Sequence, residues 1–168
     1  ETLIGDQPFA VVLADDLCDA PGKGVLAQMV DLYKKYGCSI VAIEEIPKED
    51  TNKYGVIAGN EIEPGIYMVK DMVEKPEPEV APSNLAIIGR YILTPDIFNI
   101  IRETKPGKGG EIQITDALLT QAKKGMVLAF KFEGQRFDCG SIDGFVKATN
   151  YFYDKETKKE EAAKKKTG

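Results

Sequence analysis

Two acidic motifs stand at the ends of apolar segments that lie far apart in the sequence. Asp15 and Asp16 follow the β-branched run "FAVVL", and Asp138 lies in "RFDCG", between an apolar approach and a glycine. In open α/β sheets, ligands collect beyond the carboxyl ends of strands. Carboxylates there suit Mg²⁺, whose octahedron is completed by waters and phosphate oxygens. Asp15 and Asp16 fit equally well an acidic turn that caps the next element. The residues alone support the pairing of Asp15 with Asp138 only weakly, since nothing in the sequence shows that the two meet.

A third motif, Glu74-Lys75-Pro76, places opposite charges at the mouth of a proline-rich loop. Successive strand residues point to opposite faces, so both side chains reach one ligand only if the chain bends at Lys75. Pro76 restricts Lys75 to extended or turn geometry, which favours such a bend. Glu74 is then suited to sugar hydroxyls and Lys75 to a phosphate. The residues by themselves favour the alternative, a solvated strand end.

Two glycines also indicate close backbone approach. Gly55 stands at the start of a strand-like run in "KYGVIAG", and Gly89 lies inside the run "LAIIGRYIL". Glycine inside a strand is costly unless a bend or a ligand requires it.

The composition narrows the possible chemistry. The 168 residues contain no histidine, which excludes a Ser-His-Asp triad, a Cys-His pair and His-ligated zinc. Any metal is therefore expected to be a hard cation, with Mg²⁺ favoured. Three isolated cysteines suit a reducing compartment, so we expect a cytoplasmic protein. A net charge of -5 argues against nucleic acid as a partner, and the short apolar runs argue against a membrane.

The first part of the chain predicts a βαβ unit with a parallel sheet. "FAVVL", residues 9 to 13, and "CSIVAIEEI", residues 38 to 46, have the character of buried strands. The segment 23 to 36 between them carries apolar residues at helical spacing and ends before Gly37. Strand, helix and strand in this order imply a parallel sheet.

The remainder alternates short strands with helices. Strands are predicted in residues 54 to 59, 65 to 76, 85 to 93, 126 to 134 and 135 to 140, with turns around Asn60 and Pro64-Gly65. Helices are predicted from Thr94-Pro95 to about Arg102, from a start capped by Thr115 and Asp116 to Lys124, and over residues 142 to 155. The segment "KPGKGGE" lacks the spacing of a phosphate-binding loop and is expected to be a hinge or surface loop.

Six segments, taken in order, resemble the bacterial UTP–glucose-1-phosphate uridylyltransferases, also called UDP-glucose pyrophosphorylases. They are "VVLADD", "KYGVI", "VEKP", "APSNLAIIGRYIL", "GGEIQITDAL" and "RFDCG". "VEKP" alone is common to many sugar nucleotidyltransferases, whereas its combination with the fourth and fifth segments is specific. The resemblance extends from about residue 3 to residue 153.

This resemblance implies a nucleotide-diphospho-sugar transferase fold, a Rossmann-like α/β/α sandwich around a mainly parallel mixed sheet. It implies an Mg²⁺-dependent enzyme that makes UDP-glucose and pyrophosphate from UTP and glucose 1-phosphate. Matched residue by residue, Asp15 and Asp138 correspond to the metal carboxylates, and Lys75 to the residue that contacts the sugar phosphate. Glu74 corresponds to the residue that binds the glucose hydroxyls, and Gly55 to a glycine whose backbone lies against the sugar.

The sequence departs from that family in one large respect. Members begin with a glycine-rich GxGTR loop that cradles the triphosphate, and no such loop occurs in these residues. We therefore expect residues 1–153 to be the C-terminal portion of the nucleotidyltransferase domain, holding the sugar-phosphate and metal half. Residues 154–168 are expected to form a lysine-rich tail, either a frayed helix or disordered.

Two alternatives to a uridylyltransferase follow. One is a thymidylyltransferase of the same superfamily, and the other is a non-catalytic module that binds a sugar phosphate or takes part in assembly. A homo-oligomer is expected because, in the family, the region of "GGEIQITD" lies near a subunit contact.

Overall fold

The computed structural model describes the backbone of residues 1–166, and all of their side chains except those of 108, 160, 162, 163, 165 and 166. Its elements follow in the order β1 (Phe9–Val12), β2 (Asp16–Asp19), α1 (Val25–Tyr36), β3 (Ser39–Glu45), η1 (Lys48–Lys53), β4 (Gly55–Glu63), β5 (Ile66–Glu74), β6 (Leu85–Leu93), α2 (Ile97–Glu103), η2 (Lys108–Gly110), α3 (Ile114–Ala122), β7 (Val127–Lys131), β8 (Gln135–Asp138) and α4 (Ile142–Lys166).

Six of the strands form one mixed sheet in the order β1-β6-β3-β7-β5-β4. The β3–β7 pairing is parallel, whereas β1, β3 and β4 all run antiparallel to β6. Strands β1, β3, β4 and β7 therefore share one direction, although most neighbours in the described sheet are antiparallel. The expected mixed sheet is confirmed. Four of its strands run in the same direction, but of these only β3 and β7 lie next to each other in the described sheet and form a parallel pair.

The predicted βαβ unit is present with differences. The first strand was expected to be buried, but β1 lies at the edge of the sheet and is only partly buried, and β2 comes between it and α1. Helix α1 connects the β1 side of the sheet to β3, and these two strands run the same way, but β6 lies between them and pairs with both. The sequence near the first strand could not reveal this, because β6 comes from residues 85 to 93, far along the chain.

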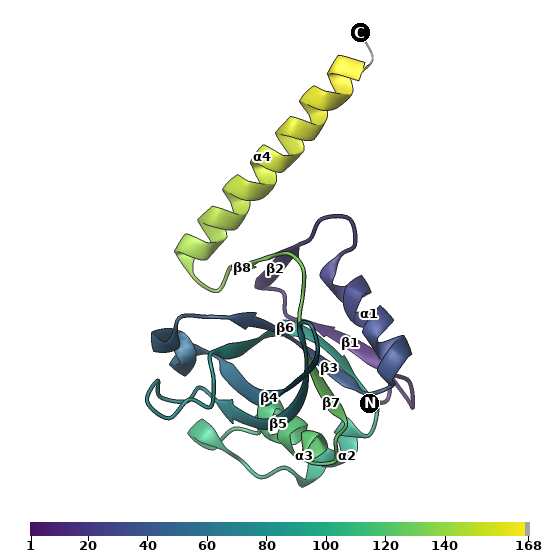
Figure 1. Cartoon of the computed structure of the whole chain (residues 1–168), viewed down its shortest axis with the longest axis vertical. Coiled ribbons are helices and arrows are strands. Elements are labelled where there is room, and N and C mark those ends of the chain that lie inside the picture. Colours follow the sequence, from purple (N-terminus) through teal and green to yellow (C-terminus); the bar gives the residue numbers. More distant parts are fainter. Residues whose placement is uncertain (167–168) are drawn as a thin grey trace.

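Helices cover both faces of the sheet, as Figure 1 shows. Residues of β3 alternate between two cores, since successive strand side chains point to opposite faces. Ile40 and Ala42 pack with Met29 of α1, whereas Val41 and Ile43 join the cluster that contains Ile97 of α2 and Leu118 of α3. The expected α/β/α sandwich is thereby confirmed.

Glycines mark two of the predicted stops. Gly37 ends α1 in the left-handed conformation with φ 65°, and its N–H donates to the carbonyl of Tyr33. Gly65, with φ 74°, makes the turn of the β4–β5 hairpin. The turn predicted around Asn60 is wrong, because β4 continues through that residue with a register shift between Ala58 and Gly59.

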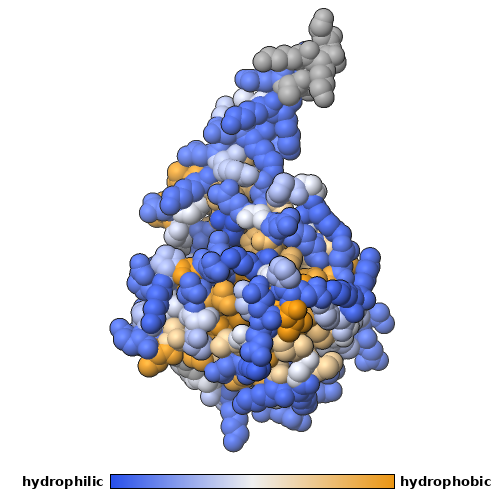
Figure 2. Space-filling model, viewed as in Figure 1, coloured by the Kyte–Doolittle hydropathy of each residue, from blue (hydrophilic) through white to orange (hydrophobic). Residues whose placement is uncertain are grey.

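The sequence did not predict β2, which pairs antiparallel with β8 in a separate two-stranded ribbon. Phe137 of β8 packs on Tyr151 and Phe152 of α4, with ring centroids 4.8 and 5.7 Å apart. Beyond these contacts α4 projects away from the sandwich, covered mainly by hydrophilic side chains (Figures 1 and 2).

Helix α4 runs to Lys166, past the expected end at residue 155. The division of the chain at residues 153 and 154 stays a prediction. None of the described helices is long and apolar enough to cross a membrane.

Candidate active site

A pocket of about 390 Å³ opens between the main sheet, the β2–β8 ribbon and the start of α3. All five residues predicted from the sequence line it, namely Asp15, Gly55, Glu74, Lys75 and Asp138. They come from four separate parts of the chain.

The ribbon brings Asp15 and Asp138 to the same side of the pocket. Asp15 directly precedes β2, and its carbonyl accepts a hydrogen bond of 2.7 Å from the N–H of Cys139. A Cβ built on Gly140 would lie 3.2 Å from Oδ1 of Asp138 and 3.5 Å from Oδ2 of Asp15. The two carboxylates therefore flank one point in space, where the glycine leaves room.

This pair is suited to a small hard cation. The described residues contain no group of three or more His, Cys, Asp or Glu side chains arranged for a metal. Mg²⁺ needs no such group, because it usually keeps several waters and takes one or two carboxylates plus substrate phosphates. The oxygens of Asp15 and Asp138 fit that pattern.

The bend expected at Lys75 is present. β5 ends at Glu74, and Lys75 adopts a left-handed conformation with φ 47°, while its N–H donates to the carbonyl of Tyr54 over 3.0 Å. Non-glycine residues rarely adopt a positive φ and do so at a cost. The bend turns Nζ of Lys75 to within 4.0 Å of Oε1 of Glu74, so both charges border the same pocket.

The floor of the pocket is built by the β4–β5 hairpin and α3. In the hairpin ladder Gly55 stands directly opposite Glu74. A Cβ on Gly55 would meet Glu74 Oε2 at 3.1 Å, Thr115 Oγ1 at 3.2 Å and Ile87 Cδ1 at 3.3 Å. A side chain at position 55 would therefore press on Glu74 and Thr115, and the glycine leaves their contact undisturbed.

The role predicted for Thr115 is wrong. Helix α3 begins at Ile114 after Gln113, and its N-cap position makes no side-chain hydrogen bond. The hydroxyl of Thr115 instead donates to Oε2 of Glu74 over 2.6 Å. Thr115 is thus a site residue that the sequence reasoning missed, because a threonine near a helix start is typical of a cap.

Arg136 is a second residue that was missed. Its side chain is only 7% exposed and makes ion pairs with Asp16, with Asp138 at 3.1 Å and with Glu44 at 3.6 Å. The guanidinium carbon lies 5.0 Å from the ring centroid of Tyr54. The available signal was its place in "RFDCG", two residues before Asp138 and so on the same face of β8.

Asp138 is held by several donors. Its Oδ2 accepts from Tyr54 Oη over 2.8 Å and from Arg136, and its Oδ1 accepts from the N–H of Gly140 over 3.1 Å. Burial alone would raise the pKa of Asp138, but the Tyr54 hydrogen bond and the Arg136 charge outweigh it and hold the pKa below its usual value. The carboxylate is therefore ionised at neutral pH.

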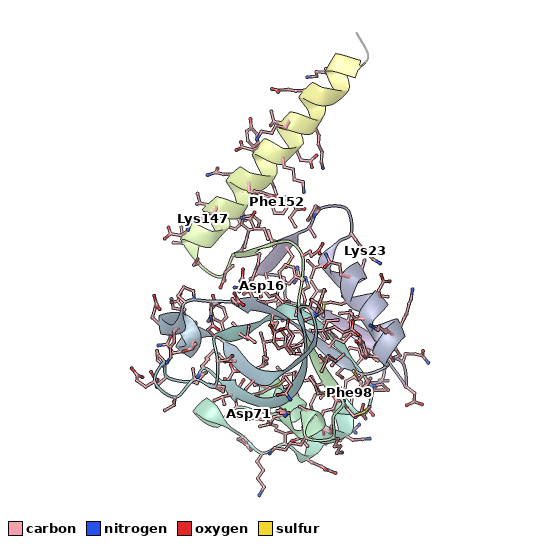
Figure 3. The ribbon with its side chains drawn as sticks, in the orientation of Figure 1. Asp16, Lys23, Asp71, Phe98, Lys147 and Phe152 are labelled. Atoms are coloured by element: carbon pink, nitrogen blue, oxygen red, sulfur yellow. The ribbon has the colours of Figure 1, made fainter. Side chains whose placement is uncertain are left out.

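Asp16, the neighbour of Asp15, is buried and structural. Its Oδ2 accepts from the N–H of Gly89 over 2.7 Å, and its Oδ1 accepts from Nε of Arg136. A Cβ on Gly89 would lie 2.6 Å from both Oδ2 of Asp16 and Cβ of Leu13, which explains the glycine inside β6. Figure 3 shows Asp16 at the junction of the ribbon and the main sheet.

The pocket is thus lined by two carboxylates able to hold a cation, by a third carboxylate opposite a glycine, and by Lys53 and Lys75. Such a set can bind a ligand that carries both hydroxyls and phosphate.

A family model described as "Nucleotidyl transferase" matches residues 1–155. The chain is 69% identical over 153 residues to a UTP–glucose-1-phosphate uridylyltransferase of Pseudomonas aeruginosa, covering 90% of this chain and 55% of that protein. It is 46% identical over 149 residues to the enzyme of the same name from Bacillus subtilis, covering 89% of this chain and 51% of the relative. The chain therefore spans about half the length of the curated relatives it matches.

Solved structures give the same picture. A UDP-glucose pyrophosphorylase complexed with UDP-glucose has a TM-score of 0.88 and 62% identity, over 92% of this chain and 59% of the other. A UTP-bound UGPase from Acinetobacter baumannii has a TM-score of 0.77 and 33% identity, over 90% of this chain and 52% of the other.

Proposed function

Because this chain belongs to the nucleotidyl transferase family, we propose that it supplies the sugar-phosphate and metal half of a UTP–glucose-1-phosphate uridylyltransferase. One observation carries the proposal: Asp15, Gly55, Glu74, Lys75 and Asp138, spread over 124 positions of sequence (138 − 15 + 1), line a single pocket.

In the proposed reaction, a phosphate oxygen of glucose 1-phosphate attacks the α-phosphorus of UTP. A new phosphorus–oxygen bond forms, the bond between the α-phosphorus and its bridging oxygen breaks, and pyrophosphate leaves. The nucleophile is already an anion, so the reaction needs no histidine base, in keeping with a chain that has none. Catalysis then depends on alignment and on charge neutralisation.

The sugar phosphate is bound by the floor of the pocket. Glu74, fixed on one side by Thr115, accepts hydrogen bonds from glucose hydroxyls, and the bare backbone of Gly55 lets the ring approach closely. Lys75, turned by its left-handed backbone, neutralises the phosphate.

Asp15 and Asp138 would hold Mg²⁺. When bound there, the ion would supply Lewis-acid stabilisation for the charge that develops on the phosphates. Tyr54, Arg136 and the N–H of Gly140 keep Asp138 ionised and oriented.

A binding measurement tests the sugar-phosphate site in this chain. Glucose 1-phosphate is titrated calorimetrically against the chain and against Glu74→Gln, with the exposed Glu77→Gln as the matched control. We expect binding to be retained in the control and lost in Glu74→Gln. Equal affinity in all three proteins would contradict the proposed sugar site.

A turnover measurement tests the activity. The chain is joined to the preceding residues of the Pseudomonas aeruginosa relative, and UDP-glucose formation is followed with UTP against dTTP. Preference for dTTP would indicate the thymidylyltransferase alternative. Binding of glucose 1-phosphate without turnover in the joined protein would indicate the non-catalytic module. Normal activity in Asp138→Ala would remove that aspartate from the mechanism.

The same relatives bear on nucleotide choice. Relatives at 45 to 69% identity from Pseudomonas aeruginosa, Staphylococcus epidermidis and Bacillus subtilis carry the uridylyltransferase name, which supports UTP as the substrate. The similarity to a thymidylyltransferase structure, at 21% identity, concerns the fold alone. Homo-oligomerisation and a cytoplasmic location stay predictions.

A further inference from the structure

We propose that Arg136 is a positioning residue that orients Asp138 toward Asp15, and that this orientation sets the affinity of the pocket for a divalent cation. The inference rests on the proposed function, because it concerns the carboxylate pair assigned there to Mg²⁺.

The pairing of β2 with β8 brings two carboxylates face to face, and Arg136 contacts both of them. Its register places Asp16 directly opposite Asp138. Like charges at directly opposed positions of an antiparallel pair repel each other. Arg136 lies two residues from Asp138, on the same face of the ribbon, and its guanidinium bridges the two carboxylates.

The guanidinium is itself fixed. Its Nε donates to Oδ1 of Asp16, and its two terminal nitrogens lie 3.1 Å from Asp138 Oδ2 and 3.6 Å from Glu44 Oε2. The ring of Tyr54 packs on it, and the side chain is almost fully buried. A planar group with several donors holds its partners in set directions, which a single ammonium cannot do.

The contacts of Asp138 divide its two oxygens between different tasks. Oδ2 accepts from Tyr54 and Arg136, whereas Oδ1 accepts from the N–H of Gly140 and, like Oδ2 of Asp15, borders the space beside Gly140. Holding Oδ2 therefore aims Oδ1 at the point that the two carboxylates share.

Asp16 connects this arrangement to the main sheet. Its Oδ2 accepts from the N–H of Gly89 in β6, so Arg136 is braced against the sheet and not only against the two-stranded ribbon. An isolated two-stranded ribbon is marginally stable in water. The brace through Asp16 gives Asp138 a fixed position relative to Glu74 and Lys75.

Charge balance is the competing explanation for Arg136, and it makes opposite predictions. If Arg136 only neutralised nearby carboxylates, Arg136→Met would bind a cation more tightly, because a repelling charge is removed, and Arg136→Lys would leave affinity unchanged. If Arg136 orients Asp138, both variants bind the cation more weakly. Removal of such outer contacts typically costs 10- to 100-fold in metal affinity.

The experiment measures Mn²⁺ affinity of the 168-residue chain by electron paramagnetic resonance, without nucleotide or sugar. We expect Arg136→Lys and Arg136→Met to bind about tenfold more weakly than the parent. Tyr54→Phe, which keeps the ring under the guanidinium but loses the hydroxyl, is expected to lose less. The matched control is Arg90→Met, because Arg90 donates to the carbonyls of Leu13, Asp16 and Gly89, and no hydrogen bond joins it to a carboxylate of the described residues.

The outcomes separate this inference from the proposed function. Parent-like or tighter Mn²⁺ binding in Arg136→Lys would overturn the positioning role and leave the carboxylate pair intact. Equal losses in Arg90→Met and Arg136→Lys would assign the effect to general loosening of the loop and also overturn it. Absence of Mn²⁺ binding in the parent would overturn the cation pair itself, and the inference with it, whereas glucose 1-phosphate binding tests the sugar site separately. If Arg136→Met does not fold, Arg136→Lys and Tyr54→Phe still decide the question.

Discussion

The hydroxyl of Thr115 donates a hydrogen bond to Oε2 of Glu74 over 2.6 Å, which joins the first turn of α3 to the last residue of β5. A carboxylate held in this way is oriented before any ligand arrives. The hairpin ladder adds Gly55 directly opposite, so three elements meet at one side chain.

The first prediction concerns this hydrogen bond. Thr115→Val keeps the shape of the side chain but removes the donor, and we expect glucose 1-phosphate affinity to fall several-fold, because a hydrogen bond of this kind contributes about 1 kcal/mol. Calorimetric titration provides the measurement. Thr120→Val, on the exposed side of the same helix, is the control. An unchanged affinity in Thr115→Val would limit Thr115 to a structural role.

The second prediction compares two glycines of β4. A Cβ on Gly55 would crowd the ends of side chains at 3.1 to 3.3 Å, whereas a Cβ on Gly59 would lie 2.4 Å from the carbonyl oxygen of Met68. We expect Gly55→Ala to weaken sugar-phosphate binding about tenfold at little cost in stability. Gly59→Ala is expected to lower the free energy of unfolding by about 1 to 3 kcal/mol, since backbone yields less than side chains. Urea denaturation measures the stability of each variant, and calorimetry measures its affinity for glucose 1-phosphate. The same change in both quantities for the two variants would contradict the prediction.

The third prediction uses the left-handed backbone of Lys75. Lys75→Ala and Lys75→Gly both remove the ammonium, so we expect both to lose glucose 1-phosphate binding to the same extent. Only glycine relieves the positive φ of 47°, which costs a non-glycine residue about 1 kcal/mol. The glycine variant is therefore expected to be the more stable of the two in urea denaturation. A more stable alanine variant would argue against strain at this position.

The fourth prediction concerns alkaline pH. Burial, helped by the nearby charges of Glu74 and Asp16, raises the pKa of Tyr91 from 10.0 to about 12. As the pH rises, the unfolded chain therefore releases the Tyr91 proton before the folded chain does. The stability that protonated Tyr91 contributes is complete below about pH 10 and is lost as the pH rises through about 12. The loss amounts to about 2 to 3 kcal/mol.

Tyr91→Phe should flatten this part of the pH profile of unfolding, because phenylalanine has no proton to release. Tyr153→Phe, at a tyrosine that is 71% exposed, is the control and should leave the profile as it is. Denaturation midpoints of both variants are measured between about pH 9 and pH 12. The same slope against pH in the two variants would contradict the assignment.

The pocket residues were predicted from local motifs together with a family resemblance, because the motifs alone left Glu74 and Lys75 more consistent with a solvated strand end. Asp15 follows the β-branched run of β1, Gly55 and Glu74 are bounded by hairpin signals, and Asp138 precedes a glycine. The family resemblance ordered these motifs, and the structure brought them together in one pocket.

Other features could not be read locally. β2 has four residues, "DLCD", without apolar alternation, and its partner β8 comes more than a hundred residues later. The bond from Thr115 to Glu74 and the bridge from Arg136 to Asp16 likewise join distant segments. The insertion of β6 between β1 and β3 has the same origin, because strand order in a sheet is a tertiary property.

The β2–β8 ribbon also has a consequence for how the protein folds. The contact of Arg136 with Asp16 closes a loop of 120 residues, whereas the β4–β5 hairpin pairs neighbours in sequence. Contacts between distant segments form slowly, because closing a long loop costs conformational entropy before the new contacts stabilise the chain. We therefore expect the β4–β5 hairpin that carries Glu74 to assemble early and the Asp15–Asp138 pair to be completed in the last kinetic phase. A chain caught during refolding would then already hold Gly55 opposite Glu74 before its two aspartates came together.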